Sequence, residues 1–261
     1  MEVKLVRADP AGNITLLVTS PVEPEKRAEV ARALLNIPEL GGEQVGYLTA
    51  PNLGGAARLE MMGGEFCGNA LRSAGFLTAR GIQGRTSLAM ECSGCREQLQ
   101  VTVDRDAGEA TAQLPLPRRV TETQLCGQSL GVVEFDGIVH GILEGRTPDR
   151  DLAAGVTRAL AQRYRTGAAG LMFLRYETGW QMDPAVYVAG TDTLYFESSC
   201  ASGSGAAAVY LSDEASDGVY PYAIRQPGGT IRVGVIRQDG EPVLLTVGGP
   251  VALGKELTIE L

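Results

Sequence analysis

The chain has 261 residues, a formal net charge of −8 at pH 7 and 44% hydrophobic residues, which suits two medium-sized domains or one large one. The negative charge and the lack of a long Lys/Arg run exclude a nucleic-acid-binding surface. No apolar run reaches the roughly 18 residues of a membrane span. The first twenty residues lack the regions of a signal peptide, so we expect a cytoplasmic protein without a membrane partner.

The first half of the chain predicts several strands and one outer helix. Apolar or alternating runs at residues 3–6 and 14–18 predict a strand pair, joined by a turn at residues 10–13. Residues 24–36 predict an amphipathic helix. Its predicted apolar face consists of Ala28, Ala31, Leu34 and Leu35. Further strands separated by glycine-rich turns are predicted at residues 57–62, 87–91, 98–103 and 109–114.

Residues 115–119 are rich in proline and arginine and predict a domain boundary. After it, Thr147 as N-cap and Pro148 at the first helical position predict the start of a second outer helix. Strands are predicted at residues 131–135, 138–143, 171–176, 185–188 and 194–197, and through 230–261 with turns at 239–240 and 248–249. We therefore expect an α/β (α+β) fold with a first domain of residues 1–115, completed by a last strand at about 250–261, and a second domain of residues 116–249.

Two segments of small residues, 63–74 and 197–208, have the same organisation. In each, a strand is followed by a cysteine, Cys67 or Cys200, and then by a Gly/Ala/Ser-rich helix, which indicates a weak internal repeat. A cysteine just before a helix lies in the field of unpaired N–H groups, which favours the thiolate and lowers the thiol pKa. The next backbone N–H groups can bind an anion, and small residues let a ligand approach them closely.

Two such sites facing each other would form an active site for proton transfer. Both helix N-termini could hold the carboxylate of an amino acid, with a thiolate on one face of its α-carbon and a thiol on the other. One cysteine would remove the α-proton and the other would return a proton to the opposite face. Preorganised N–H groups in a closed cleft would stabilise the developing negative charge.

Scarce residue types limit other chemistries. His140 is the single histidine, so we expect no metal site, and its place within a strand favours a core position. The three lysines, Lys4, Lys26 and Lys255, lie near the termini or in a charged helix. None of them suits the Schiff base of pyridoxal phosphate, and we expect no cofactor. The five cysteines are an odd number, which indicates free thiols.

On its cysteine motifs the chain resembles the diaminopimelate epimerase-like superfamily, which carries Cys-Gly-Asn in the first half and Cys-Gly-Thr/Ser-Gly in the second. It is more similar to the histidine racemases that make D-histidine for opine-type metallophores. The segments that carry this resemblance are residues 9–13, 43–46, 65–70, 197–200 and 226–229. The resemblance implies two pseudo-symmetric domains, each a curled, mostly antiparallel sheet around a central helix. It also implies a small amino-acid substrate and a homodimer.

The resemblance assigns site residues as well. It implies that Cys67 and Cys200 are catalytic and that Glu197 lies near the substrate ammonium. It further implies that Asn13 contacts the substrate and that Glu43 faces the distal side chain, where a carboxylate suits an imidazole N–H. The positions whose backbone would hold the α-carboxylate are Gly68, Asn69, Ala201 and Ser202.

The chain departs from the superfamily pattern at three positions. Ala70 and Ala201 stand where glycine is usual, and Ser198 stands where diaminopimelate epimerases have an arginine. The missing arginine weighs against diaminopimelate epimerase, which remains an alternative together with proline or hydroxyproline epimerase.

Two alternatives belong to other classes of protein. One is a thiol redox protein that uses Cys92 and Cys95, whose CxxC spacing by itself more often has a structural role. The other is a non-catalytic amino-acid-binding protein of the same fold. Residues 226–229, Gln-Pro-Gly-Gly, predict a turn.

Overall fold

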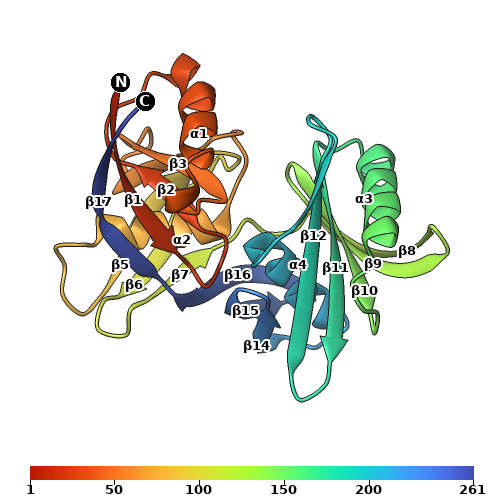
Figure 1. Cartoon of the computed structure of the whole chain (residues 1–261). Coiled ribbons are helices and arrows are strands. Elements are labelled where there is room, and N and C mark those ends of the chain that lie inside the picture. The colour runs from red at the N-terminus through yellow and green to blue at the C-terminus, as the bar shows by residue number, and fades with distance from the viewer. The chain divides into compact units, whose positions relative to one another are not determined.

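The structure, a computed structural model, describes residues 1–261. The chain forms two compact units (Figure 1). The N-terminal unit comprises Met1–Gln113 and Gly248–Leu261, and the C-terminal unit comprises Leu114–Val247. Seventeen strands and four α-helices make up the fold, which confirms the expected α+β class. No helix has the length and apolar character needed to span a membrane.

The N-terminal unit contains two α-helices, two 3-10 helices and eight strands. The helices are η1 (Pro24–Lys26), α1 (Arg27–Leu35), η2 (Pro38–Leu40) and α2 (Gly68–Thr78). The strands are β1 (Glu2–Asp9), β2 (Thr15–Val18), β3 (Gln44–Thr49), β4 (Ala57–Met61), β5 (Arg85–Cys92), β6 (Leu99–Asp104), β7 (Glu109–Gln113) and β17 (Ala252–Glu260). Strand β1 pairs antiparallel with both β2 and β17. The pairs β2–β3 and β4–β5 are parallel, whereas β3–β4, β5–β6 and β6–β7 are antiparallel.

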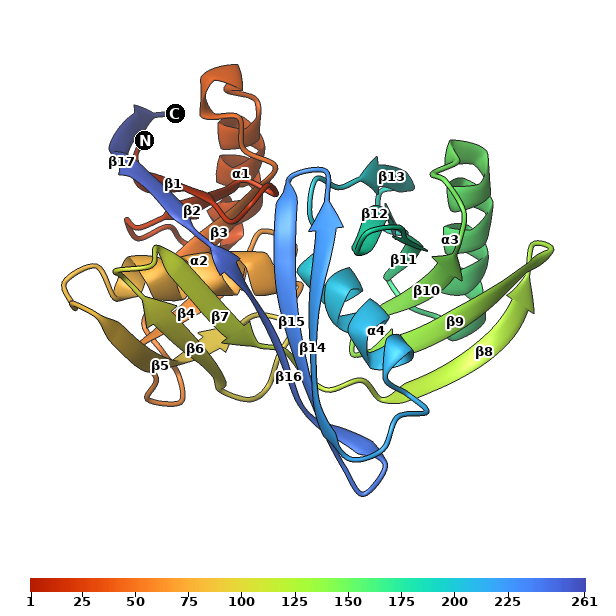
Figure 2. The same ribbon diagram turned by 90° about the horizontal axis from the view of Figure 1, so that it is seen from below.

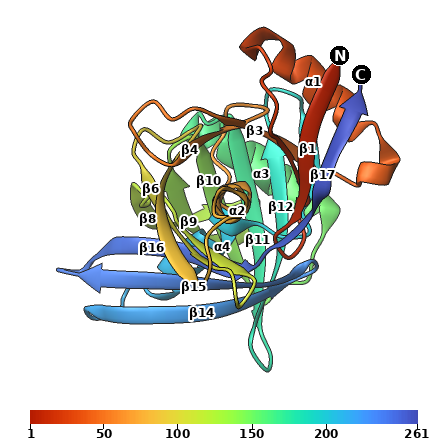
Figure 3. The same ribbon diagram turned by 90° about the vertical axis from the view of Figure 1, so that its left-hand side faces the viewer.

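Helix α2 is the buried centre of the N-terminal unit. Every residue from Gly68 to Leu77 is buried, and the helix packs against strands β2, β4, β5, β6 and β7. A Cβ atom at Gly75 would lie 2.5 Å from Cγ1 of Val101, so the close approach of helix and sheet requires glycine there. Figure 3 looks nearly along α2, and strands of the same unit pass on several sides of it.

The C-terminal unit contains two α-helices and eight strands, and a ninth strand leads out of it. The helices are α3 (Arg150–Tyr164) and α4 (Ala201–Leu211). The strands are β8 (Arg119–Leu125), β9 (Gln128–Phe135), β10 (Ile138–Glu144), β11 (Ala168–Tyr176), β12 (Trp180–Val188), β13 (Thr193–Phe196), β14 (Gly218–Gln226), β15 (Gly229–Gln238) and β16 (Glu241–Pro250). The pairs β10–β11 and β12–β14 are parallel. The pairs β8–β9, β9–β10, β11–β12, β12–β13 and β14–β15 are antiparallel.

Helix α4 is the central helix of the C-terminal unit. It packs against β9, β10, β11, β14 and β15 (Figure 2), and its residues from Gly203 to Val209 are all buried. A Cβ atom at Gly205 would lie 2.7 Å from Cδ1 of Leu114. Small residues on every side of α4 therefore allow strands to surround it.

The predicted start of one helix and one predicted turn were wrong. Helix α3 begins at Arg150 with Asp149 as its N-cap, whose Oδ1 accepts the Leu152 N–H at 2.8 Å; Thr147 lies outside the helix, and aspartate is the stronger cap. The glycines at 248–249 do not form a turn, because β16 continues to Pro250. A Cβ atom at Gly248 would lie 2.4 Å from Oγ1 of Thr111, so that glycine allows close strand packing instead.

Candidate active site

Cys67 and Cys200 occupy equivalent positions in the two units. Each is the N-cap of an eleven-residue helix, α2 or α4, and each has extended backbone angles, −135° and 109° for Cys67 and −124° and 109° for Cys200. The Cys67 Sγ accepts the Ala70 N–H at 3.4 Å, and the Cys200 Sγ accepts the Gly203 N–H at the same distance. Each sulfur therefore takes the role that a serine or threonine oxygen has at an ordinary helix start.

The first two residues of each helix are the predicted carboxylate-binding residues. Gly68 and Asn69 begin α2, and Ala201 and Ser202 begin α4. The first N–H groups of a helix have no partner within it, and the helix dipole adds a partial positive charge there. This local structure suits a carboxylate, and the binding role of the four residues stays a prediction.

The Cys200 thiol is buried and lies against the Glu197 carboxylate. Burial raises its pKa well above the ordinary value, and the charge of Glu197 and its hydrogen bond raise it further. The Gly203 N–H and the Ser202 hydroxyl lower the pKa by less. This differs from the sequence expectation of a lowered pKa at the helix start, because the loss of hydration outweighs the helix terminus. Cys200 therefore carries its proton at neutral pH.

Sequence reasoning missed Gln226, which holds the Cys200 loop. Its Oε1 accepts the Cys200 N–H at 2.8 Å, and its Nε2 donates to Oγ of Ser204 at 2.8 Å. Ser204 donates in turn to the Cys200 carbonyl at 2.6 Å. The Gln-Pro-Gly-Gly segment does form a turn, between β14 and β15, and its first residue also fixes the cysteine backbone.

Arg72 has a corresponding role beside Cys67. It is fully buried in α2, and its Nε donates to Oδ1 of Asn69 at 3.2 Å. Its Nη1 donates to the Pro250 carbonyl at 2.9 Å, and its Nη2 donates to the Pro10 carbonyl. The guanidinium thus ties the turn after β1 and the end of β16 to the first turn of α2. A lone arginine among small helical residues was the available sequence signal.

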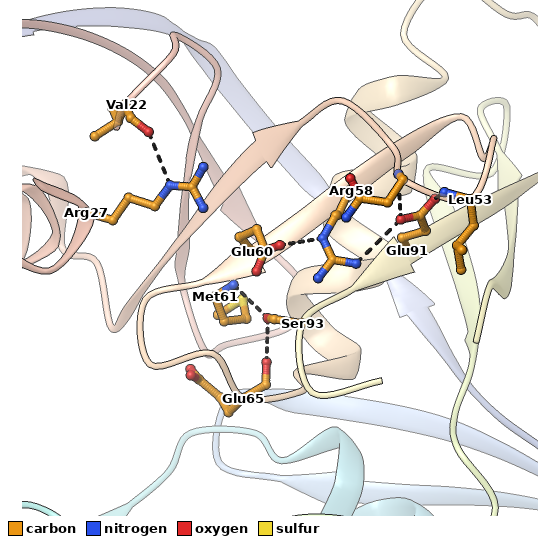
Figure 4. A network of polar contacts seen from close by, with 10 residues as sticks. Val22, Arg27, Leu53, Arg58, Glu60, Met61, Glu65, Glu91 and Ser93 are labelled. Carbon is orange, nitrogen blue, oxygen red and sulfur yellow. Dashed lines mark hydrogen bonds and ion pairs between the residues drawn. The ribbon is translucent and has the colours of Figure 1, made fainter. Parts of the chain in front are cut away.

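The turn after β5 supports the segment that leads to Cys67. Ser93 donates from Oγ to the Glu65 carbonyl at 2.7 Å and accepts the Met61 N–H at 2.8 Å, and Figure 4 shows it between these two residues. Gly94 has a φ of +71°, and a Cβ atom there would lie 2.4 Å from the Phe66 nitrogen. Only glycine allows this turn to lie so close to the backbone just before Cys67.

The two cysteines of this turn differ in environment. Cys92 is fully buried, and burial raises its pKa to about 12. Cys95 is partly exposed, and its Sγ lies 3.6 Å from the Glu97 carbonyl. Because the thiolate is the reactive form in disulfide exchange, the neutral Cys92 favours the structural role over the redox alternative. No group of three or more His, Cys, Asp or Glu side chains is arranged to hold a metal ion.

Asn13 and Glu43 lie in the loops beside β2. Asn13 is buried with a φ of +58°, and its Oδ1 accepts a hydrogen bond from Nε2 of Gln44. Glu43 is exposed, and its Oε1 accepts the Ile14 N–H at 3.1 Å. The Glu43 carboxylate therefore supports the Asn13 loop, and contacts of either residue with a substrate stay a prediction.

Glu197 is half-buried beside Cys200, and its backbone is hydrogen-bonded to strand β12. Its backbone N–H donates to the Pro184 carbonyl at 3.0 Å. A hollow of about 240 Å³ in the C-terminal unit includes Glu197, Ser198 and Pro227 in its lining. Glu197 therefore contributes both to the surroundings of Cys200 and to the lining of this hollow.

The whole chain has the fold of known racemases and related proteins. It has a TM-score of 0.68 to a probable proline racemase from Agrobacterium radiobacter K84, at 16% identity over 99% of this chain and 93% of that one. A hydroxyproline epimerase from Agrobacterium vitis gives 0.66, at 13% identity over 99% and 91% of the two chains. A Bacillus anthracis phenazine biosynthesis protein of the PhzF family gives 0.73, at 12% identity over both whole chains. The protein is therefore of the proline racemase and PhzF fold class.

Sequence comparison is more specific. The family model described as the histidine racemase CntK N-terminal domain matches residues 2–256, and the chain belongs to this histidine racemase family. A histidine racemase from Fusobacterium nucleatum strain ATCC 23726 is 30% identical over 217 residues, 79% of this chain and 80% of the relative. One from Staphylococcus aureus strain Mu50 is 25% identical over 242 residues, 88% of each chain.

Proposed function

We propose that the protein interconverts L- and D-histidine without a cofactor, with Cys67 and Cys200 as the two bases on opposite faces of the α-carbon. The observation that carries this proposal is the matched N-cap geometry, in which each sulfur accepts an N–H group at 3.4 Å from the first turn of a buried helix. Membership of the histidine racemase family supports histidine as the substrate.

The raised pKa of Cys200 suggests an order for the two proton transfers. Because Cys200 carries its proton in the free enzyme, we assign the first removal of an α-proton to Cys67. Cys67 takes the α-proton as the C–H bond breaks, and the Cys200 thiol donates its proton to the opposite face of the carbanion. The enzyme is left with a Cys67 thiol and a Cys200 thiolate, which is the state that accepts the other enantiomer.

The substrate is held, in this proposal, by groups of both units. The N–H groups that begin α2 and α4 bind the α-carboxylate and stabilise the charge that spreads onto it in the transition state. Glu197 binds the ammonium, Asn13 contacts the amino acid, and Glu43 accepts the imidazole N–H. The carboxylate-binding residues are Gly68, Asn69, Ala201 and Ser202.

The decisive experiment is α-proton exchange in D2O, followed by proton NMR with reduced enzyme. We expect L-histidine to lose its α-proton signal and D-histidine to appear, and Cys67→Ala and Cys200→Ala each to lose at least about 1,000-fold in rate. Cys126→Ser is the matched control, because Cys126 is an exposed cysteine in a turn. Full activity in either catalytic variant would contradict the two-base mechanism.

The substrate panel should also contain L-proline, trans-4-hydroxy-L-proline and diaminopimelate. The fold likeness to a proline racemase and a hydroxyproline epimerase favours the first two as second candidates. Ser198, in place of an arginine beside Glu197, speaks against diaminopimelate. Exchange of proline but not histidine would keep the mechanism and overturn the substrate.

The proposal extends to the biological setting. We place the enzyme in the cytoplasm as a homodimer that supplies D-histidine for metallophore assembly. The free cysteines agree with a reducing compartment. Light scattering coupled to size exclusion tests the dimer, and a mass near 27.5 kDa would contradict it.

A further inference from the structure

A line of three polar groups runs from the core of the C-terminal unit to the sulfur of Cys200. His140 lies on β10 and is fully buried. Its Nε2 is 3.0 Å from Oγ of Ser202, and this Oγ is 3.6 Å from the Cys200 Sγ. Ser202 is the second residue of α4, so its hydroxyl lies between the imidazole and the thiol.

The surroundings of His140 are built to hold an imidazole. A Cβ atom at Gly170 on β11 would lie 2.4 Å from Nδ1 of His140, so glycine provides the space for the ring. The Phe135 ring meets the imidazole edge-on, with 6.1 Å between ring centroids. Nδ1 has no hydrogen-bond partner, which is unfavourable for a buried nitrogen. An apolar side chain would fill this space without leaving a buried nitrogen unpaired. The property that an apolar side chain cannot supply is the contact of Nε2 with Ser202.

His140 is a neutral imidazole at working pH. Burial lowers its pKa to about 3, and no charged group contributes to that shift. A neutral imidazole is a donor at one ring nitrogen and an acceptor at the other. When Nε2 donates to Ser202, the single hydroxyl proton is free to point at the Cys200 sulfur and stabilise a thiolate. When Nε2 accepts from Ser202, the hydroxyl oxygen is free to accept from a Cys200 thiol.

We propose that His140 is a positioning residue for Cys200, acting through Ser202, whose hydroxyl it orients toward the sulfur. The inference rests on the proposed function only for the part that Cys200 plays in turnover. The residue equivalent to Ser202 at the start of α2 is Asn69, which receives a hydrogen bond from the Arg72 guanidinium. The second residues of the two helices therefore have different partners, a neutral imidazole for Ser202 and a guanidinium for Asn69.

The Ser202 hydroxyl acts against the two groups of effects that raise the pKa of Cys200, burial and the Glu197 carboxylate. The Glu197 carboxylate and burial oppose the thiolate, and the Gly203 N–H favours it. Loss of the hydroxyl therefore leaves Cys200 with a smaller fraction of thiolate at any pH below its pKa. Loss of the imidazole also lowers the thiolate fraction of Cys200, because the Ser202 hydroxyl is then no longer held and can turn away from the sulfur.

The test is the rate at which iodoacetamide alkylates each cysteine at pH 8, measured by peptide mass spectrometry on the full chain. Only the thiolate reacts, so the rate at Cys200 reports its thiolate fraction, and Cys67 in the same sample is the internal control. We expect Ser202→Ala and His140→Phe to slow alkylation of Cys200 about tenfold, which corresponds to about one pKa unit. Ser202→Thr, which keeps a hydroxyl, and His140→Gln, which keeps a donor, should stay near the wild-type rate.

Three outcomes would overturn the inference. They are an unchanged or faster rate at Cys200 in Ser202→Ala or in a folded His140→Phe, an equal slowing at Cys67 and Cys200, or no rescue by threonine. Ser202→Ala keeps the test valid if His140→Phe does not fold. The measurement is independent of turnover. A slowed Cys200 without α-proton exchange by the wild type would refute the racemase, and exchange with an unaffected Cys200 would refute the positioning role.

Discussion

Cysteine is not among the residues that normally cap helices. Serine, threonine, aspartate and asparagine are preferred, because their oxygen atoms accept the N–H of the first turn well, whereas sulfur is a weak acceptor. Both Cys67 and Cys200 nevertheless stand at the cap of a buried helix. At these two positions the thiol therefore contributes less to helix stability than an oxygen would. The proposed function gives the thiol a chemical role instead, in proton transfer.

A serine at the same position should separate stability from activity. We expect Cys67→Ser to keep or raise the free energy of unfolding, by up to about 1 kcal/mol, because the hydroxyl is the better cap. The same variant should lose α-proton exchange, since a hydroxyl is a far weaker base than a thiolate at neutral pH. Urea unfolding and NMR exchange on one sample check both parts. A stable variant with wild-type exchange would contradict a catalytic role for Cys67.

His140 gives the fold a measurable dependence on pH. Its pKa is lowered from 6.5 to about 3 in the folded protein, so the unfolded chain binds the proton more tightly. The contribution to stability is complete above pH 6.5 and is lost as the pH falls toward 3, by up to about 1.4 kcal/mol for each pH unit. Because the chain has a single histidine, His140→Gln removes this term.

Urea unfolding of both proteins between pH 7 and 4 is the measurement. The wild type should lose stability more steeply than His140→Gln, and parallel curves would show that the imidazole is hydrated or paired in solution. The carboxyl groups are common to both proteins and cancel in the comparison.

At the scale of elements, the periodic patterns located most helices and strands, and the errors have local causes. The buried face of α1 consists of Val30, Ala31 and Leu34, and Ala28 is exposed. The predicted face contains two successive steps of three residues, from 28 to 31 and from 31 to 34. Because an α-helix repeats every 3.6 residues, these steps place Ala28 away from the side on which Leu34 lies. The turn residues at 239–240 do connect β15 and β16 with positive φ angles, as predicted.

The start of α3 can be tested by two neighbouring alanine variants. Asp149→Ala should lower the free energy of unfolding by about 1 kcal/mol, because the Leu152 N–H loses its acceptor. Thr147→Ala should change it by less than about 0.5 kcal/mol, as for most surface positions. Thermal unfolding of the two variants side by side decides between the caps. A larger loss for Thr147→Ala would restore the cap that the sequence pattern favoured.

At the scale of the whole molecule, the N-terminal unit is assembled from both ends of the chain. Strand β17 pairs with β1 from Glu2 to Asp9, and the Pro250 carbonyl accepts a hydrogen bond from Arg72. The first turn of α2 therefore depends on a residue 178 positions later in the chain than Arg72.

The proposed mechanism requires the sulfurs of Cys67 and Cys200 to face each other across the substrate. We expect diamide to oxidise the two thiols to a disulfide, with its own reduction to the hydrazine, and to abolish racemisation until dithiothreitol is added. Peptide mapping without reduction should show the Cys67–Cys200 link, and excess histidine should slow its formation. Cys126→Ser should remain equally sensitive. Inactivation without this link, or resistance to diamide, would contradict the opposed arrangement.

Much of the candidate site follows from the sequence alone. Each cysteine, the small residues after it and the helix that they begin are neighbours in the chain, and local patterns describe neighbours well. The tertiary structure decided the groups that hold and tune these cysteines. Gln226 reaches Cys200, Arg72 reaches Pro10 and Pro250, and His140 reaches Ser202 only after folding. The raised pKa of Cys200 is also a tertiary property, because it depends on burial and on the charge of Glu197 rather than on the helix start that the sequence reveals.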